Sequence, residues 1–177
     1  MQLTAKGNGA PSLMEGAAAR LKAMNSSILT FDTLPDFVGR QIGVSSWIEV
    51  PQTRIDAFAD CTGDRQWIHV DIARARRESP YRETIAHGFL TLSLLPIAVY
   101  ELFEGLRAKK SINYGLDRVR FISPVRAGSR VRVKSTLLEA EERPEEWFLL
   151  RSENTVEVEG EEKPALVAVS LGLFCKA

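Results

Sequence analysis

An apolar segment near the middle of the chain restricts the fold more than any other feature. Residues 88–106 carry no charged side chain before Glu101. A helix that is apolar on every side is normally buried on every side, so this segment predicts a central helix that the rest of the chain must cover. Pro96 predicts either a kink in this helix or a break, after which a second helix begins with Pro96 in its first turn. Its longest apolar stretch, residues 89–100, is shorter than the ~20 residues of a membrane-spanning helix, so no membrane span is expected.

The residues after this segment alternate in the manner of β-strands. Apolar side chains recur at every second position in residues 112–116 and 131–133, and longer strand candidates cover residues 147–158 and 164–174. A shorter strand region, residues 39–50, precedes the helix. These elements must share one core, and a curved antiparallel sheet around a single buried helix satisfies that requirement. The predicted fold class is therefore α+β.

Two further helices are predicted between the first strands and the apolar segment. One begins at Thr53, with Asp56 as its capping-box partner, and ends at the Gly63-Asp64 turn. The other covers residues 72–77, with Asp71 as its N-cap.

The length of 177 residues favours one folded domain. We assign residues 36–177 to this domain and residues 1–35 to an N-terminal extension. Ser12 and Glu15 have the spacing of a capping box, which indicates one short helix in the extension. Glu15 is the only acid before residue 30, as in some transit peptides. A surface appendage on a cytoplasmic protein is the simpler interpretation.

Composition excludes several classes of protein. The hydrophobic fraction of 45% is too high for a disordered chain. Lys and Arg number 23 and Asp and Glu also number 23, a balance that argues against a dedicated nucleic-acid-binding protein. Cys61 and Cys175 do not form a disulfide framework or a zinc motif, so we expect two free thiols in a reducing compartment.

Charge is distributed unevenly over the predicted strands. Residues 105–135 hold nine basic side chains and one acidic one, whereas residues 139–162 hold ten acids and two bases. Cross-strand ion pairs on a solvent-facing sheet are one interpretation. Binding of a phosphorylated ligand or an acidic carrier protein is the other.

The only two histidines, His69 and His87, lie close in sequence to Asp64, Asp71 and Ser93. Histidine is the usual general acid or base near neutral pH. Asp64 and His69 converge only if the chain between them is irregular, because a helix or strand would point them apart. Asp64, His69, Asp71 and His87 as metal ligands are an alternative, without a recognised spacing. Ser93 lacks the G-x-S-x-G context of a hydrolase nucleophile.

His87-Gly88 immediately precedes the apolar helix. The free N–H groups at a helix start can polarise a carbonyl group, and glycine allows a ligand to approach the backbone closely. Such a donor would suit chemistry beside a thioester carbonyl. Gly88 is equally well explained as a packing glycine.

Two sequence segments together resemble a known family. Residues 58–71, FADCTGDRQWIHVD, and residues 85–90, IAHGFL, resemble the MaoC-like dehydratases, which include the (R)-specific enoyl-CoA hydratases. The nodulation protein N-like branch is the closer resemblance, also through residues 112–115, INYG, and residues 119–125. The resemblance covers about residues 39–174.

The resemblance implies a hot-dog fold, in which the sheet wraps around the central helix, and a homodimer with acyl tunnels near the subunit interface. It also implies a reaction, the reversible syn hydration of a trans-2-enoyl thioester to the (R)-3-hydroxyacyl thioester. The substrate would be a thioester of coenzyme A or of an acyl carrier protein. Neither a metal nor a redox cofactor is expected.

The resemblance also implies roles for individual residues. Asp64 and His69 match the catalytic pair that holds and activates one water molecule. The N–H of Gly88 matches the group that polarises the thioester carbonyl. Ser93 is expected to steady Asp64 or His69 by a hydrogen bond, and His87 is expected to be structural.

Asn113 and Tyr114 are expected to line the acyl tunnel. The chain departs from the hydratases at Gln66-Trp67, where they commonly have Asn-Pro. The bulk of Trp67 is expected to affect which substrate the protein binds more than which reaction it catalyses. Two other functions stay open, a hot-dog thioesterase and a non-enzymatic acyl-thioester binding protein.

Overall fold

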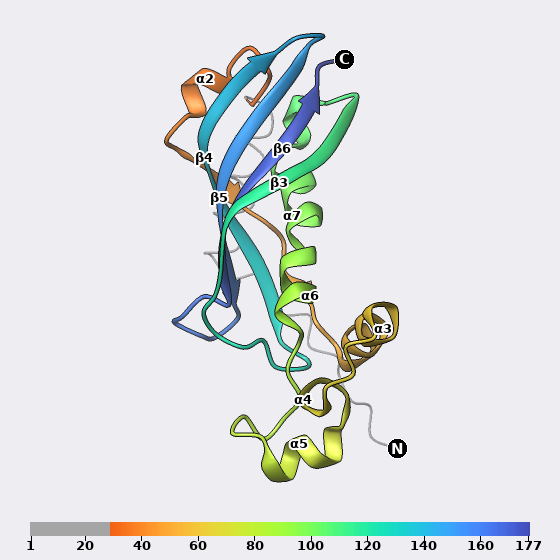
Figure 1. Cartoon of the computed structure of the whole chain (residues 1–177). Helices are drawn as coiled ribbons and strands as arrows, with labels where there is room; N and C mark the ends of the chain where they lie inside the picture. The colour runs from red at the N-terminus through yellow and green to blue at the C-terminus, as the bar shows by residue number, and fades with distance from the viewer. Residues whose placement is uncertain (1–28) are drawn as a thin grey trace, which may run out of the picture.

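The computed structural model describes residues 29–177, so the short helix predicted near Ser12 lies outside the described residues. Among the described residues, a short helix and two short strands are followed by a run of helices, and long strands fill the second half of the chain (Figure 1). In chain order the elements are α2 (Leu34–Phe37), β1 (Gln41–Val44), β2 (Ile48–Glu49), α3 (Gln52–Thr62), α4 (Trp67–Val70), α5 (Ile72–Glu78), α6 (Gly88–Ser93), α7 (Leu95–Leu102), the 3₁₀ helix η1 (Glu104–Leu106), β3 (Lys110–Phe121), β4 (Arg130–Arg143), β5 (Trp147–Val158) and β6 (Leu166–Cys175).

All strands within residues 29–177 belong to one six-stranded antiparallel sheet. The strand order is β1-β4-β5-β6-β3, and β2 also pairs with β4. The sheet curves around α6 and α7, while α3, α4 and α5 gather at the α6 end of the central helix (Figure 1). The predicted α+β hot-dog arrangement is therefore confirmed.

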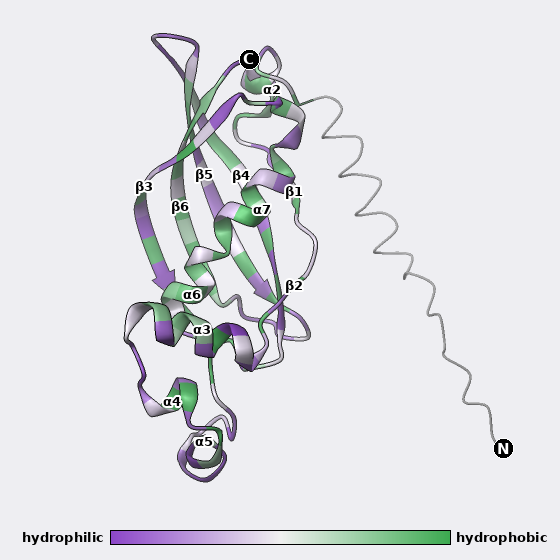
Figure 2. Ribbon diagram, turned by 90° about the vertical axis from the view of Figure 1, so that its right-hand side faces the viewer, coloured by the Kyte–Doolittle hydropathy of each residue, from purple (hydrophilic) through white to green (hydrophobic). Residues whose placement is uncertain are grey.

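The apolar segment forms the central helix in two parts. α6 ends at Ser93, Leu94 lies between the two helices, and α7 starts at Leu95 with Pro96 in its first turn. Proline lacks an N–H and fits only the first turn of a helix without loss of a bond, which explains the position of the break. Green, hydrophobic stretches lie along both α6 and α7 (Figure 2).

The core has two neighbouring clusters. One joins Leu90, Leu94 and Ala98 of the central helix to inward-facing residues of β4, β5 and β6. The other gathers around Leu102, Phe103 and Leu106, and it includes Leu29, Phe31 and Leu34, all buried. The end of the predicted extension thus contributes to the core, and the boundary at residues 35 and 36 stays a prediction.

The shorter helices agree with the sequence except at one cap. α5 is capped by Asp71, whose carboxylate accepts a hydrogen bond from the Arg74 N–H at 2.9 Å. The capping box predicted at Thr53 is wrong, because α3 begins one residue earlier, after Pro51, without a side-chain cap. Asp56 instead accepts a 2.7 Å bond from Gln52 Nε2.

Part of the charge asymmetry is explained by pairing between strands. Arg130 pairs with Glu159, and Arg132 Nε lies 2.8 Å from Glu157. Arg151 bridges Asp117 and Glu139 at 2.7 and 3.0 Å. Solvent-exposed pairs of this kind contribute at most about 1 kcal/mol each, so they affect the register of the sheet more than its stability.

One smaller expectation also agrees with the structure. Cys61 and Cys175 are both free thiols. Within residues 29–177, none of the helices combines the length and the apolar character that crossing a membrane requires.

Candidate active site

The loop between α3 and α4 brings Asp64 and His69 together. α3 ends at Gly63, whose φ of 81° lies in the left-handed region that glycine adopts without strain. Asp64 follows in a loop without regular secondary structure, and the single turn of α4 then places His69. The irregular chain that the spacing requires is therefore present.

His69 is buried, with 6% of its surface exposed, and its ring is fixed by one strong hydrogen bond. Nδ1 lies 2.7 Å from the backbone oxygen of Ile85. A carbonyl oxygen only accepts hydrogen bonds, so Nδ1 carries the proton of the neutral ring, and Nε2 is left with a free lone pair. A histidine in this tautomer can accept a proton at Nε2.

His87 connects the two members of the pair. Its Nε2 donates a 2.8 Å hydrogen bond to the backbone oxygen of Asp64. Its ring stacks on that of His69, with centroids 3.8 Å apart and planes 27° apart, and Phe58 packs beside it at 5.0 Å. Nδ1 of His87 is buried and has no hydrogen-bond partner among the described residues.

One ligand atom from each of Asp64, His69 and His87 lies within 4.8 Å of the other two. Asp71 is outside this group, because its carboxylate caps α5. Imidazole lone pairs lie in the ring planes, and two stacked rings do not direct them to one tetrahedral ion. The two histidines are therefore poorly arranged for a tetrahedral metal site, and the expectation of no metal stays a prediction.

Burial lowers the pKa of His69 below its ordinary value of 6.5. The hydrogen bond to Ile85 opposes this shift, His87 adds to it, and the charge of Asp64 raises the pKa again. Burial is the largest of these effects, since it penalises the charged imidazolium. His69 is therefore neutral at pH 7, as a proton acceptor must be.

Gly88 begins α6, as predicted, and packs closely against the end of β3. A Cβ atom at Gly88 would lie 2.9 Å from the ring of Phe121, a distance that real Cβ contacts do not show. The packing role is thus visible in the structure. The role of its N–H as a donor to the thioester carbonyl stays a prediction.

The hydroxyl of Ser93 donates a 2.7 Å bond to the Leu90 oxygen of its own helix. It makes no bond to Asp64 or His69 in this structure, contrary to the expectation. A serine in a helix readily bonds a preceding carbonyl in this manner, and its spacing from Gly88 could not show which acceptor it uses.

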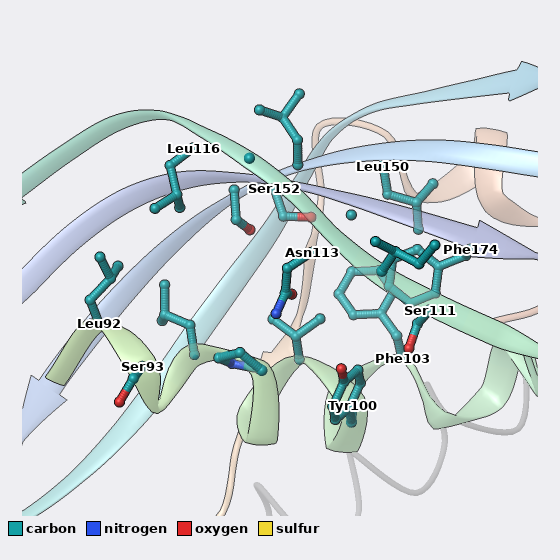
Figure 3. Close-up of a pocket in the computed structure, with 18 residues that line it drawn as sticks. Leu92, Ser93, Tyr100, Phe103, Ser111, Asn113, Leu116, Leu150, Ser152 and Phe174 are labelled. Carbon is teal, nitrogen blue, oxygen red and sulfur yellow. The ribbon is translucent and has the colours of Figure 1, made fainter. Parts of the chain in front are cut away.

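A cavity of about 290 Å³ lies between the central helix and strands β3, β5 and β6 (Figure 3). Ser93 and Asn113 line it, together with apolar residues such as Leu92, Val99 and Phe103. Tyr114 is not among the residues that line it and is 64% exposed, so its predicted tunnel-lining role is not seen within one subunit.

Trp67, the departure from the hydratase motif, lies outside this cavity. The Arg74 guanidinium covers its ring at 4.3 Å from the centroid. The indole is thus packed against α5 and does not narrow the cavity.

Two features of the site were missed from the sequence. One is that His87 contacts both Asp64 and His69, and the other is that the Ile85 carbonyl fixes the His69 ring. The signal for His87 was present, since both histidines of the chain lie near the same loop. A backbone acceptor such as Ile85 leaves no mark in the sequence.

Comparisons with known proteins agree with this geometry. The family model for the MaoC like domain matches residues 34–158. Nodulation protein N of Rhizobium leguminosarum is 49% identical over 79% of this chain and 88% of its own length. The 3-hydroxyacyl-thioester dehydratase Z of Mycobacterium tuberculosis is 45% identical over 80% of this chain and 95% of its own.

A solved structure supports the fold. The R-hydratase PhaJ1 of Pseudomonas aeruginosa aligns with a TM-score of 0.64 over 79% of this chain and 83% of its own, at 24% identity. The resemblance to the MaoC-like and nodulation protein N-like sequences is thus confirmed.

Proposed function

This chain belongs to the MaoC-like domain family, and on that premise we propose that it catalyses the reversible hydration of trans-2-enoyl thioesters to (R)-3-hydroxyacyl thioesters. The observation that carries the proposal is the pairing of a buried His69, with a free Nε2, and the Asp64 carboxylate. The name of the mycobacterial relative, a 3-hydroxyacyl-thioester dehydratase, supports a hydro-lyase activity.

In the proposed reaction, Asp64 and His69 hold one water molecule. His69 Nε2 accepts a proton from this water while its oxygen bonds to C3 of the enoyl group. The electrons of the C2=C3 bond move toward the thioester oxygen, where the Gly88 N–H stabilises the developing charge. The Asp64 carboxylate stabilises the imidazolium that forms.

The second half of the reaction returns the proton. The His69 imidazolium delivers it to C2, and the thioester carbonyl is restored. Because one pair serves both steps from one face, the hydrogen and the hydroxyl add syn, and the pair ends in its starting state. No metal or redox cofactor takes part, so we expect full activity in the presence of EDTA.

The head of the substrate, coenzyme A or an acyl carrier protein, is proposed to bind basic side chains near the same end of the helix. Arg118 and Arg120 are exposed on β3 shortly before Phe121, which packs on Gly88. Arg126 lies beside Ile85 through a backbone bridge. These three form no ion pair with another described side chain, which leaves them available to phosphates or acidic groups. We place the reaction in the cytoplasm.

The loss of enone absorbance when purified protein is added to crotonyl-CoA tests the proposal. Release of free thiol without loss of the enone would indicate a thioesterase, in which water attacks the carbonyl carbon. Binding without turnover of short and long enoyl thioesters would favour the non-enzymatic binding protein. The intact Asp64 and His69 argue against the latter.

The lowered pKa of His69 predicts the pH dependence of the reaction. The base must be neutral, so activity is lost as the pH falls through this pKa and is complete above it. We expect kcat/KM for hydration to be level near neutrality and to decline only below the ordinary histidine value of 6.5. A fall in kcat/KM that begins above pH 6.5 on lowering the pH would contradict the assignment of His69 as a base with a lowered pKa.

We also propose a homodimer that forms through β3 and the central helix. β3 is an edge strand, paired on one side by β6. Exposed apolar side chains concentrate there and on α6 and α7, a distribution typical of an interface. They are Phe89, Ile97, Tyr100, Ile112, Tyr114, Leu116, Phe121 and Ile122.

A charge at the centre of this surface should disrupt the dimer. Tyr114→Asp is expected to shift the protein from dimer to monomer at micromolar concentration, because the carboxylate would be buried without a partner. Sedimentation equilibrium measures the change. Val38→Asp, at an exposed apolar residue away from this surface, is the control and should stay dimeric. A wild-type monomer would refute the proposal.

A further inference from the structure

The cavity beside the central helix has a polar side that a plain alkyl chain does not need. Ser111, Asn113, Ser152 and Ser170 line it from β3, β5 and β6. Asn113 and Ser152 lie in its middle, between Leu92 at one end and Phe103 at the other (Figure 3). The side chains of Ser111, Asn113 and Ser152 make no hydrogen bond to another described residue. Ser152 is buried, with 4% of its surface exposed, whereas Asn113 also reaches the surface.

The hydroxyl of Ser170 is oriented by a buried neighbour. Asn154, with 0% of its surface exposed, donates from Nδ2 to Ser170 Oγ at 2.8 Å and to the Ser152 backbone oxygen at 3.1 Å. Ser170 Oγ therefore accepts one bond within the sheet, and its own hydrogen remains to be donated. No described residue accepts it, and the cavity lies on its open side.

The same polar layer continues under the cavity. Asn154 Oδ1 and the hydroxyl of Ser135, its register partner on β4, are buried without a hydrogen-bond partner. Buried polar groups without partners are unfavourable for stability, so apolar side chains at these two positions beneath the sheet's polar residues would have been the more stable choice.

The cavity also defines the charge of its occupant. Its lining holds serine, asparagine, tyrosine and apolar residues, with no acidic or basic side chain. A carboxylate or an ammonium group would therefore be buried without a counter-charge, which is strongly unfavourable. A hydroxyl or carbonyl oxygen can instead accept a hydrogen bond from Ser170, Ser152 or the Asn113 amide, and a hydroxyl can also donate to the Asn113 side-chain oxygen.

We propose that the acyl group in this cavity is oxygenated, with a neutral hydroxyl or keto oxygen partway along its chain. The inference rests on the proposed function and takes the cavity as its acyl-binding part, because Leu92 and Ser93 of α6, the helix that Gly88 begins, line the cavity. A volume of about 290 Å³ accommodates an acyl tail of roughly ten non-hydrogen atoms, at ~30 Å³ for each group the size of a water molecule. The substrate is thus a medium-chain oxygenated enoyl thioester.

Competing thioesters of one length test the proposal. Trans-2-decenoyl-CoA is compared with analogues that carry a hydroxyl or keto group at C6, C7 or C8, and kcat/KM for hydration is measured for each. We expect at least one analogue to exceed the plain chain by ~10-fold or more, since a site that binds an oxygen leaves its polar groups unpaired when the oxygen is missing. Equal values, or a preference for the plain chain, would overturn the proposal.

Variants of the polar side test its cause. Ser170→Ala and Ser152→Ala should each bring the ratio of kcat/KM for the oxygenated and the plain substrate toward one. Thr155→Ala, on the opposite face of β5, is the matched control and should leave the ratio unchanged. An unchanged ratio in both serine variants would show that the polar layer does not select the substrate.

A binding measurement separates this inference from the proposed function. Calorimetry compares decanoyl-CoA with its hydroxy and keto analogues, which are saturated and cannot be hydrated. Tighter binding of an oxygenated analogue, reduced in Ser170→Ala, supports the inference even if no thioester is hydrated. Normal hydration with no preference in binding would refute the inference alone and leave the hydratase assignment intact.

Discussion

Replacement of Asp64 by Asn or of His69 by Ala is expected to lower kcat for the hydration of an enoyl thioester at least ~100-fold, the usual scale for a lost general acid or base. Asn retains the size of Asp but cannot stabilise the imidazolium. Ala removes the Nε2 lone pair that the Ile85 hydrogen bond leaves free. The measurement is the initial rate of enone loss at saturating substrate.

The double variant gives the sharper result. Residues that act on one water molecule lose their effect together, so the double variant should be little slower than the slower single one. Asp71→Asn is the matched control, because Asn also caps helices well and Asp71 lies outside the pair. It should keep wild-type activity. Full activity in Asp64→Asn would exclude the proposed mechanism.

Sequence patterns predicted the fold well where the periodicity is strong. The apolar segment from Gly88 gave the central helix, and Pro96 gave its break, because proline tolerates few helix positions. The long strands β4 and β5 alternate so regularly that only one face can be buried. The short α2 was missed, since a single turn has too few residues to show a period.

The site was predicted less completely, for a physical reason. The spacing of Asp64 and His69 permitted a pair, and the family resemblance identified it. Hydrogen bonds to backbone atoms, such as those at Ile85 and Asp64, depend on how loops fold against each other. Ser93 shows the same limit, because a helix gave its hydroxyl a local acceptor that the motif did not reveal.

His87 is the positioning residue whose removal should have the second-largest effect. His87→Phe keeps an aromatic ring to stack on His69 but removes the donor that holds the Asp64 backbone oxygen. We expect kcat to fall by ~10- to 100-fold with a smaller change in KM, because loss of orientation affects the transition state more than binding. Steady-state kinetics on crotonyl-CoA separate the two parameters.

The pH profile distinguishes positioning from a simple loss of structure. His87 helps to lower the pKa of His69, so in His87→Phe that pKa should rise and the acidic limb of kcat/KM should move to higher pH. His87→Gln retains an N–H donor and should recover part of kcat. A general loss of packing would instead lower the melting temperature of both variants and leave the acidic limb of kcat/KM at its wild-type pH. A buried residue that bonds one catalytic group and stacks on the other thus links the acid–base chemistry of this site to its fold.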